Sequence, residues 1–485
     1  MRLVVNRLIN KYKTMSLPAK AGLWFVLCNF MQRGITMITT PVFTRILPET
    51  EYGLVSTYLS WQSVLLLVTG LTLYKSLMNL YIRYDDKEKV LSSVNFLTLI
   101  ITVIWLCIYL VFRQQISAIM KMSETLVLCL FIYFVAYSGI QCWQVYKRYT
   151  FDYKSLIFVT LITTGLSSVF AVIAVLFVSH TAEARLIPQT FITAIVGVII
   201  YISTFNKGKL FYNKEIWSFS LIFCIALLPH HLSEFVLQSS DKLMINYMCG
   251  SHDVAIYSVA YSIGTLINLF TSAINNSFAP YEYQQIQAGN YEELSRTASK
   301  VITLVAVLLG LIMLFSEEIV WVFGGSKYLE STSIIVPICI GVFFSYLFQL
   351  FARVQEYFEH KATVVIPSIL CAILNLILNY IFINIYGYKA AAYTTLFCYM
   401  FFCILHYVFY KRTSMKDLNG AHIYNGKAFF LISILVIICG SLIMLLNRHT
   451  IIKYIIIAIF AFVLAVFRKR IFDVVKKTIV LGKDK

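Results

Sequence analysis

The chain has 485 residues, of which 59% are hydrophobic and only 13% are charged, and its formal net charge is +17. Soluble domains carry roughly 25% charged residues, whereas the apolar residues here come in runs of about 20, the length of a bilayer-spanning helix. These properties exclude a soluble domain and predict an all-α, polytopic membrane protein, because a lipid-exposed backbone must satisfy its own hydrogen bonds.

The positive charge does not indicate a nucleic-acid partner, because the basic residues lie between the hydrophobic runs and at both ends, as a topology signal would. The eleven cysteines occur singly within or beside these runs. They show no C-x-x-C spacing and no histidine at metal-binding distance, so we interpret them as packing residues and expect no metal site. The basic start passes directly into a run of spanning length, without the cleavage pattern of a signal peptide.

Fourteen hydrophobic runs are predicted to be transmembrane helices. In chain order they cover residues 19–42, 53–80, 91–112, 123–146, 155–179, 186–205, 216–240, 254–282, 298–323, 331–357, 362–385, 389–410, 427–446 and 450–467. An even number places both termini on one side. If that side is cytoplasmic, its loops and tails hold 28 of the 40 Lys and Arg, the opposite loops hold 9, and three lie within spans. This bias predicts cytoplasmic termini. No loop exceeds roughly 15 residues, so function is expected within the membrane.

A weak internal repeat suggests how the spans are grouped. Residues 51–56 open the second span, and residues 253–258, with a similar pattern, open the eighth span 202 residues later (253 − 51). Six spans return the chain to the same side, and repeats of this kind are typical of secondary transporters. We therefore expect an N-terminal lobe of six spans (1–214), a second lobe of six spans (215–412), and a trailing helical pair with a basic cytoplasmic tail (413–485).

Three basic residues fall inside the spans, and Arg33 is the leading candidate for substrate binding. It shares a face with Asn29 and costs on the order of 2.5 to 3.5 kcal/mol at mid-membrane, so something must compensate it. A lipid diphosphate bound in a bidentate manner would do so. The alternative is a static ion pair or a bond to nearby carbonyls. Asn275 belongs to a second polar stripe, in span eight, and is a further candidate.

The other two cations have simpler explanations beside the functional one. Lys75 lies in the inner half of span two, where its long stem could reach the headgroups. Arg353 shares a face with Glu356, one turn away, which would neutralise it as a structural pair. We retain both as candidate substrate ligands.

Span seven carries the polar residues predicted to serve ion coupling or gating. A desolvated carboxyl such as Glu234 can bind and release a proton or ligate Na+, and His230 and His231, about one turn below, could share the proton. A gating salt bridge between Glu234 and Arg33, with no transported ion, is the alternative. Asp241 and Lys242 lie nearer the outer boundary, where a structural or gating role is expected. Pro229 predicts a bend in this helix.

Four sequence patches resemble the polysaccharide transporter family of the multidrug/oligosaccharidyl-lipid/polysaccharide flippase superfamily, which includes the O-antigen (Wzx-type) and capsule flippases. The patches are Pro41–Gly53, Ser240–Ile245 with Ile256–Ala260, Lys327–Glu330, and Asn375–Tyr380 with Tyr386–Ala392. They occur in family order over most of the chain. One departure is Lys389, where the family usually has glycine, so close helix packing at that turn is not assured.

The resemblance implies two helical lobes around a central cavity that opens alternately to each side of the inner membrane. The expected substrate is an undecaprenyl-diphosphate-linked oligosaccharide, moved from the cytoplasmic to the outer leaflet for O-antigen or capsular polysaccharide assembly. The implied partners are this lipid, membrane lipid, and a polysaccharide polymerase with chain-length machinery, but no nucleic acid. No enzymatic activity is expected, and no cofactor beyond a coupling H+ or Na+.

Two other functions are compatible with parts of the sequence. A cation-coupled multidrug exporter of the same superfamily would line its cavity with acidic and aromatic residues rather than cations. A membrane glycosyl polymerase or acyltransferase would need catalytic residues near the outer surface, usually on a sizeable loop. The short loops disfavour this enzyme class.

Overall fold

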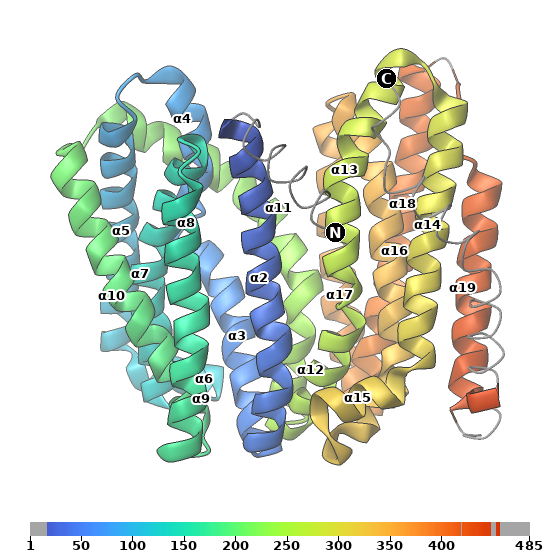
Figure 1. The fold of residues 1–485 in the computed structure, drawn as a ribbon, viewed down its shortest axis with the longest axis horizontal. Helices are drawn as coiled ribbons and strands as arrows, with labels where there is room; N and C mark the ends of the chain where they lie inside the picture. Colours follow the sequence, from blue (N-terminus) through green and yellow to red (C-terminus); the bar gives the residue numbers. More distant parts are fainter. Residues whose placement is uncertain (1–16, 419, 448–452, 456–485) are drawn as a thin grey trace, which may run out of the picture. The chain divides into compact units, whose positions relative to one another are not determined.

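The computed structural model describes residues 17–418, 420–447 and 453–455 of the chain. Every regular element within these residues is a helix (Figure 1), which confirms the all-α prediction. The chain divides into two compact units, Met1–Phe235 and Val236–Lys485, and each is described by itself. The division falls inside one long helix, some twenty residues after the lobe border predicted at 214/215 (235 − 214 = 21). The predicted three-part division remains a prediction.

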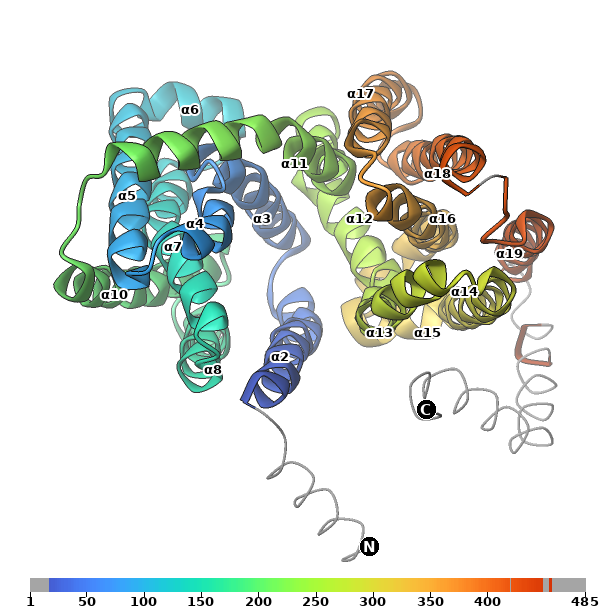
Figure 2. The same ribbon diagram turned by 90° about the horizontal axis from the view of Figure 1, so that it is seen from above.

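The first unit consists of helices joined by short connections. They are α2 (Leu17–Ile46), α3 (Glu49–Thr69), η1 (Leu73–Ser76), α4 (Leu77–Arg83), α5 (Lys87–Val111), α6 (Arg113–Met120), α7 (Glu124–Tyr149), α8 (Tyr153–Thr160), η2 (Leu161–Leu166), α9 (Ser167–Phe177), α10 (Ala182–Gly208) and the first part of α11 (Lys214–Met248). Helix α7 packs against both α5 and α10 (Figure 2). Helix α2 packs against α8 and α9.

The second unit begins within α11 and is built in the same way. Its helices are α12 (Ser251–Gly264), α13 (Ile267–Ala288), α14 (Tyr291–Leu314), α15 (Ser316–Gly324), η3 (Ser326–Ser331), α16 (Thr332–Tyr357), α17 (Lys361–Tyr386), α18 (Lys389–Asp417) and α19 (Gly426–Leu446). Helix α16 is its centre: it packs against α12, α14, α17, α18 and α19 (Figure 2). In the most apolar stretch of Ser326–Tyr357, which comprises η3 and α16, 83% of the residues are buried, so α16 is the core helix of this unit.

Within the described part of the chain, nine helices are long and apolar enough to cross a membrane, and eleven if two bent pairs each count as one span. The chain is therefore a multi-pass membrane protein, as predicted, but the count of fourteen is not confirmed. The predicted span 254–282 is split into α12 and α13. Most of the last predicted span, 450–467, lies outside the described residues.

The two bent pairs have different causes. Glu49–Thr69 and Leu73–Arg83 meet at 54°, where Leu71 and Thr72 adopt positive φ angles of 46° and 51°. A non-glycine residue in the left-handed region ends a helix at a cost of about 1 kcal/mol or more, so the surrounding packing must hold this bend. In α11 the segments Lys214–Pro229 and His231–Met248 meet at 47°. The bend predicted from this proline is therefore present, because its ring removes a helical hydrogen bond.

The first unit also shows a close helix contact at a glycine and large apolar side chains that are exposed. A Cβ built on Gly197 of α10 would lie 2.7 Å from the Cβ of Ala136 on α7, so only glycine permits this close helix contact. Large apolar side chains such as Phe170, Phe177 and Phe191 are exposed on α9 and α10. In a membrane protein such side chains face lipid.

Candidate functional site

Helix α2, which carries Arg33, has a packed side and an exposed apolar side. On the packed side, Trp24 stacks on Tyr153 of α8 with ring centroids 6.1 Å apart, and Gln32 donates a 3.5 Å hydrogen bond to Thr164. On the apolar side, Ile38 is 72% exposed. These contacts fix the rotation of α2 about its own axis.

Arg33 lies on a third, polar side of α2. Thr36 follows it there and is also exposed, and Thr40, a turn further on, is buried. At 3.6 residues per turn, Arg33, Thr36 and Thr40 form a polar strip that falls between the packed side and the apolar side. The position of Asn29 falls on the same strip, but its side chain lies outside the described residues. Arg33 is thus an exposed residue between the packed side and the apolar side of α2.

A second charged cluster lies entirely in the first unit. Lys75 Nζ is 2.6 Å from His231 Nε2, and His231 Nδ1 is 3.7 Å from Glu234 Oε2. Lys75 is on η1, directly after the bend that ends α3, and Ser76 beside it donates a 2.9 Å hydrogen bond to Ser220 of α11. The bend and the Ser76 bond together place Lys75 against α11.

This cluster brings a cation, an imidazole and a carboxylate together. The Lys75 ammonium lies 2.6 Å from Nε2 and 3.3 Å from Nδ1 of His231, so it sits at the edge of the ring that joins the two nitrogens. The side chain of Glu234 is 54% exposed and that of His231 only 16%. The cluster therefore combines an accessible carboxyl with a more buried imidazole ring. The side chain of His230 is outside the described part of the structure.

Asp241 lies in the part of α11 that belongs to the second unit. Its carboxylate is 1% exposed and accepts hydrogen bonds from Tyr257 of α12 (2.6 Å), Asn379 of α17 (2.7 Å) and Thr395 of α18 (2.8 Å). These donors are uncharged. Several such bonds stabilise a buried carboxylate in its charged form, and the Lys242 ammonium adds a favourable electrostatic interaction.

A further layer of polar side chains surrounds this carboxylate. Asn375 accepts from Ser240 (3.0 Å) and from Asn379 (3.1 Å), and donates to Thr395 (3.1 Å). Thr394 donates to Asn379. Side chains of α12, α17 and α18 therefore converge on one negative charge and donate hydrogen bonds to it.

Lys242 follows Asp241 in sequence but points elsewhere. Its ammonium lies 4.9 Å from the ring centroid of Tyr261, a cation–π contact. The hydrogen bonds of Asp241 and the cation–π contact of Lys242 therefore involve different partners, although the two opposite charges attract each other.

Arg353 belongs to a buried ion pair. Its Nε donates to Glu282 of α13 at 2.7 Å, with the arginine side chain 11% exposed and the glutamate side chain 0% exposed. Its Nη1 donates to Asn275 (3.2 Å), which itself donates to Gln349 (3.0 Å). Tyr424 donates to the other oxygen of Glu282. This network engages both predicted ligands, Arg353 and Asn275, within the unit. The carboxylate in this ion pair is Glu282, whereas the sequence had suggested Glu356.

Sequence reasoning missed the residues that complete both networks of the second unit. Glu282 stands at the edge of a predicted span, so it resembled a boundary residue, and Tyr424 lies in a segment that reads as a loop. Asn375 and Asn379 were noticed only as part of a motif. Their spacing of four residues, which places two amides on one helix face, was the available signal.

Two family models match the chain. A model described as "Polysaccharide biosynthesis protein" matches residues 19–284, which is 266 of 485 residues (284 − 19 + 1) and thus more than half of the chain. A model described as MatE matches residues 227–381. An uncharacterized membrane protein of Haemophilus influenzae is 25% identical over 181 residues. That match covers 34% of this chain and 43% of the relative, less than half of its length.

Solved structures with a similar fold are transporters. The lipid II flippase MurJ in an inward closed conformation is 15% identical, with a TM-score of 0.61, covering 90% of this chain and 100% of its own. An inward-facing multidrug resistance transporter of the MATE family is 14% identical, with a TM-score of 0.59, covering 80% and 96%. A transporter of the MOP superfamily from Pyrococcus furiosus is 14% identical, with a TM-score of 0.56, covering 82% and 96%. At these identities the likeness establishes the fold alone.

Proposed function

The chain belongs to the polysaccharide biosynthesis protein family, and from this membership we propose that it is a flippase for a lipid-linked oligosaccharide. The substrate we propose is an undecaprenyl-diphosphate-linked repeat unit, carried from the cytoplasmic to the outer leaflet of the inner membrane for O-antigen or capsular polysaccharide assembly. The proposed orientation places both termini in the cytoplasm. We assign no enzymatic step to the chain.

The observation that supports this proposal most strongly is the environment of Arg33. An exposed guanidinium on a polar strip of a helix, between a packed side and an apolar side, is suited to an anionic ligand that passes through the membrane. A guanidinium binds phosphate oxygens in a bidentate manner and keeps its charge at any physiological pH. Lys75 is the second proposed cation of this unit, and its contact with His231 holds it beside α11.

We do not retain Arg353 and Asn275 as proposed substrate ligands. The Arg353 charge is neutralised by Glu282, whose side chain is fully buried. Releasing the arginine to a substrate would leave that carboxylate uncompensated, at a cost of about 3 to 5 kcal/mol. We propose instead that this pair holds α13 against α16.

For ion coupling we propose Asp241 and the Glu234–His231 pair. A single H+ or Na+ would balance the negative charge of the Asp241 carboxylate if the donors Tyr257, Asn379 and Thr395 turned away from it. Hard cations prefer carboxylate and hydroxyl oxygens, which Asp241, Tyr257 and Thr395 supply. Lys242, predicted with Asp241, would then act as a gate through its contact with Tyr261. An inside-negative potential adds about 2.3 kcal/mol per 100 mV for each negative charge moved outward, so a coupling ion supplements an existing driving force.

The proposal is tested by Arg33 variants in cells that lack the native gene. Arg33→Ala should insert normally yet abolish surface glycan, because the diphosphate loses its bidentate partner, whereas Arg33→Lys should retain part of the activity. Arg296→Ala, which removes an exposed arginine on α14, is the matched control. Normal surface glycan with Arg33→Ala would remove Arg33 from the mechanism.

The second candidate function is a cation-coupled multidrug exporter, favoured by the MatE match over residues 227–381 and by the buried carboxylate Asp241 within it. It predicts that overexpression raises drug resistance and that Asp241→Asn abolishes this resistance. Unchanged resistance together with loss of surface glycan in a deletion strain would exclude this function.

A further inference from the structure

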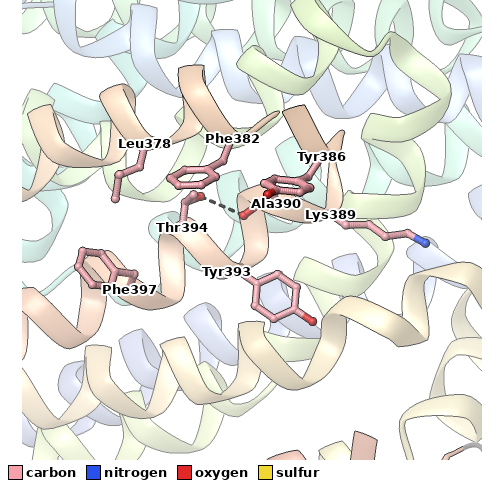
Figure 3. Close-up of a pocket in the computed structure, with 8 residues that line it drawn as sticks. All are labelled: Leu378, Phe382, Tyr386, Lys389, Ala390, Tyr393, Thr394 and Phe397. Carbon is pink, nitrogen blue, oxygen red and sulfur yellow. Dashed lines mark hydrogen bonds between the residues drawn. The ribbon is translucent and has the colours of Figure 1, made fainter. Parts of the chain in front are cut away.

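A pocket with a volume of about 610 Å³ lies between α17 and α18, on the surface of the second unit. Its walls are apolar: Leu378, Phe382 and Tyr386 come from α17, and Tyr393 and Phe397 from α18 (Figure 3). In the most apolar stretch of each helix, only 33% of the α17 residues and 39% of the α18 residues are buried. Both helices therefore present wide faces to lipid. The pocket is therefore a groove open to the hydrocarbon phase.

The floor of the groove presents no free polar group. Thr394 lies there, but it is 6% exposed and its hydroxyl is bonded to Asn379 and to the carbonyl of Ala390 (3.1 Å) (Figure 3). Ala390 beside it is small, which leaves the groove deep at that point. On the wall, the rings of Phe382 and Tyr386 are stacked with centroids 6.2 Å apart. A floor of methyl groups and walls of aromatic rings suit a hydrocarbon chain.

The length of the groove limits what can occupy it. Leu378 and Tyr386 are eight residue steps apart on α17 (386 − 378), or about 12 Å at 1.5 Å per residue. Half of a hydrocarbon core of about 30 Å is about 15 Å. The groove thus matches one acyl chain within a single leaflet and is short for a long isoprenoid tail.

A pair of opposite charges stands at the end of the groove. Lys389 extends away from the rings (Figure 3), and its Nζ lies 3.0 Å from Glu330 Oε1, with both side chains about half exposed (45% and 50%). Tyr388 donates to the same oxygen at 2.7 Å. Oε2 of Glu330 has no hydrogen-bond partner among the described residues. The turn at Gly387 places this pair at the membrane boundary.

We propose that the α17–α18 groove binds one zwitterionic phospholipid with a primary ammonium headgroup. One acyl chain fills the groove, the phosphate contacts Lys389, and the ammonium donates to Glu330 Oε2. The charge pair favours this headgroup over an anionic one, because Glu330 already neutralises Lys389 and would repel a net negative lipid. Lys389 thereby acquires a role at the position where the family pattern has glycine.

The test is native mass spectrometry of the full chain in detergent, with phosphatidylethanolamine, phosphatidylglycerol, phosphatidylcholine and a polyprenyl phosphate added at equal concentration. Wild type should retain one phosphatidylethanolamine in preference to the other three. Phosphatidylcholine should bind less because its quaternary ammonium has no N–H to donate.

Matched variants locate the site. Tyr393→Ala and Lys389→Gln should each lower phosphatidylethanolamine occupancy about tenfold, which corresponds to about 1.4 kcal/mol. Tyr380→Ala changes a tyrosine of α17 outside the groove that is 62% exposed, and Lys411→Gln changes an exposed lysine near the other end of α18. Both controls should bind as wild type does. Phe397→Leu replaces Tyr393→Ala if the latter fails to fold.

Three outcomes would overturn the proposal. Equal retention in wild type and in the groove variants would place the lipid elsewhere. Preferential retention of phosphatidylglycerol would contradict the assigned headgroup. Preferential retention of the polyprenyl phosphate would assign the groove to an isoprenoid lipid. None of these outcomes bears on the flippase proposal, whose test depends on Arg33.

Discussion

Replacing Glu282 by glutamine should destabilise the second unit strongly while leaving the local shape almost unchanged. The substitution keeps an oxygen that accepts the Tyr424 hydrogen bond but removes the charge that pairs with Arg353 at 2.7 Å. The arginine side chain is only 11% exposed, so water cannot replace the lost partner. A buried guanidinium would then remain uncompensated.

The magnitude follows from the burial of the pair. Removing one partner of a buried ion pair costs about 3 to 5 kcal/mol, and the retained hydrogen bonds argue for the lower end. At roughly 2 to 4 °C per kcal/mol for a unit of this size, the melting temperature should fall by roughly 6 to 12 °C. Glu282→Gln combined with Arg353→Met removes both charges and should recover most of this loss.

The assay is thermal unfolding of the purified chain in detergent, followed by tryptophan fluorescence. Glu292→Gln is the matched control, because Glu292 forms an exposed pair with Arg296 at 3.0 Å in the same unit. An exposed pair contributes about 0 to 1 kcal/mol, so the control should melt close to wild type. Equal melting temperatures for Glu282→Gln and Glu292→Gln, or a double variant less stable than Glu282→Gln, would refute the reasoning.

Three other predictions concern the first unit. Gly197→Leu should lower the melting temperature by an amount equivalent to about 1 to 3 kcal/mol, because its Cβ alone would meet the Ala136 Cβ at 2.7 Å; Gly310→Leu, where a Cβ meets nothing within 4 Å, should not. Asp152 caps α8 and pairs with Lys147 at 2.6 Å. Burial acts to raise the pKa of the Asp152 carboxyl, but the hydrogen bonds from Lys147 and Ser155 have the larger combined effect. The pKa of Asp152 is therefore lowered from its usual value of 3.8. The stability advantage of wild type over Asp152→Asn should therefore be full above pH 3.8 and disappear as the pH falls through the lowered pKa, which acid unfolding curves of the two proteins would measure. Lys75→Met and His231→Phe should reduce transport equally and without additivity, since each breaks the same 2.6 Å contact; additive losses in a transport assay would show that the two residues act separately.

The hydrophobic runs predicted the helices well where the chain crosses the membrane without interruption. The run 427–446 corresponds to α19, Gly426–Leu446, and 91–112 to α5, Lys87–Val111. Breaks within a run were predicted only where proline causes them, as at Pro229. The bend at Gly70–Thr72 and the break between α12 and α13 depend on backbone conformation, which hydrophobicity does not report.

Candidate residues could be found from sequence, but their partners could not. A charged side chain in a span is visible by its rarity, and this selected Arg33, Lys75, Asp241 and Arg353. The partner of each is set by helix packing across long sequence separations. Arg353 meets Glu282, 71 residues away, rather than its helical neighbour Glu356, because α13 brings a fully buried carboxylate to it.

The central claim is tested most directly by reconstituting the purified chain into liposomes that carry an undecaprenyl-diphosphate-linked oligosaccharide in one leaflet. Access of an impermeant, sugar-cleaving enzyme to the opposite leaflet then measures translocation, with and without an H+ or Na+ gradient. The account predicts rapid exposure of the sugar with wild type and none above protein-free liposomes with Arg33→Ala. Exposure at equal rates with both proteins, or no exposure with wild type under any gradient, would contradict it.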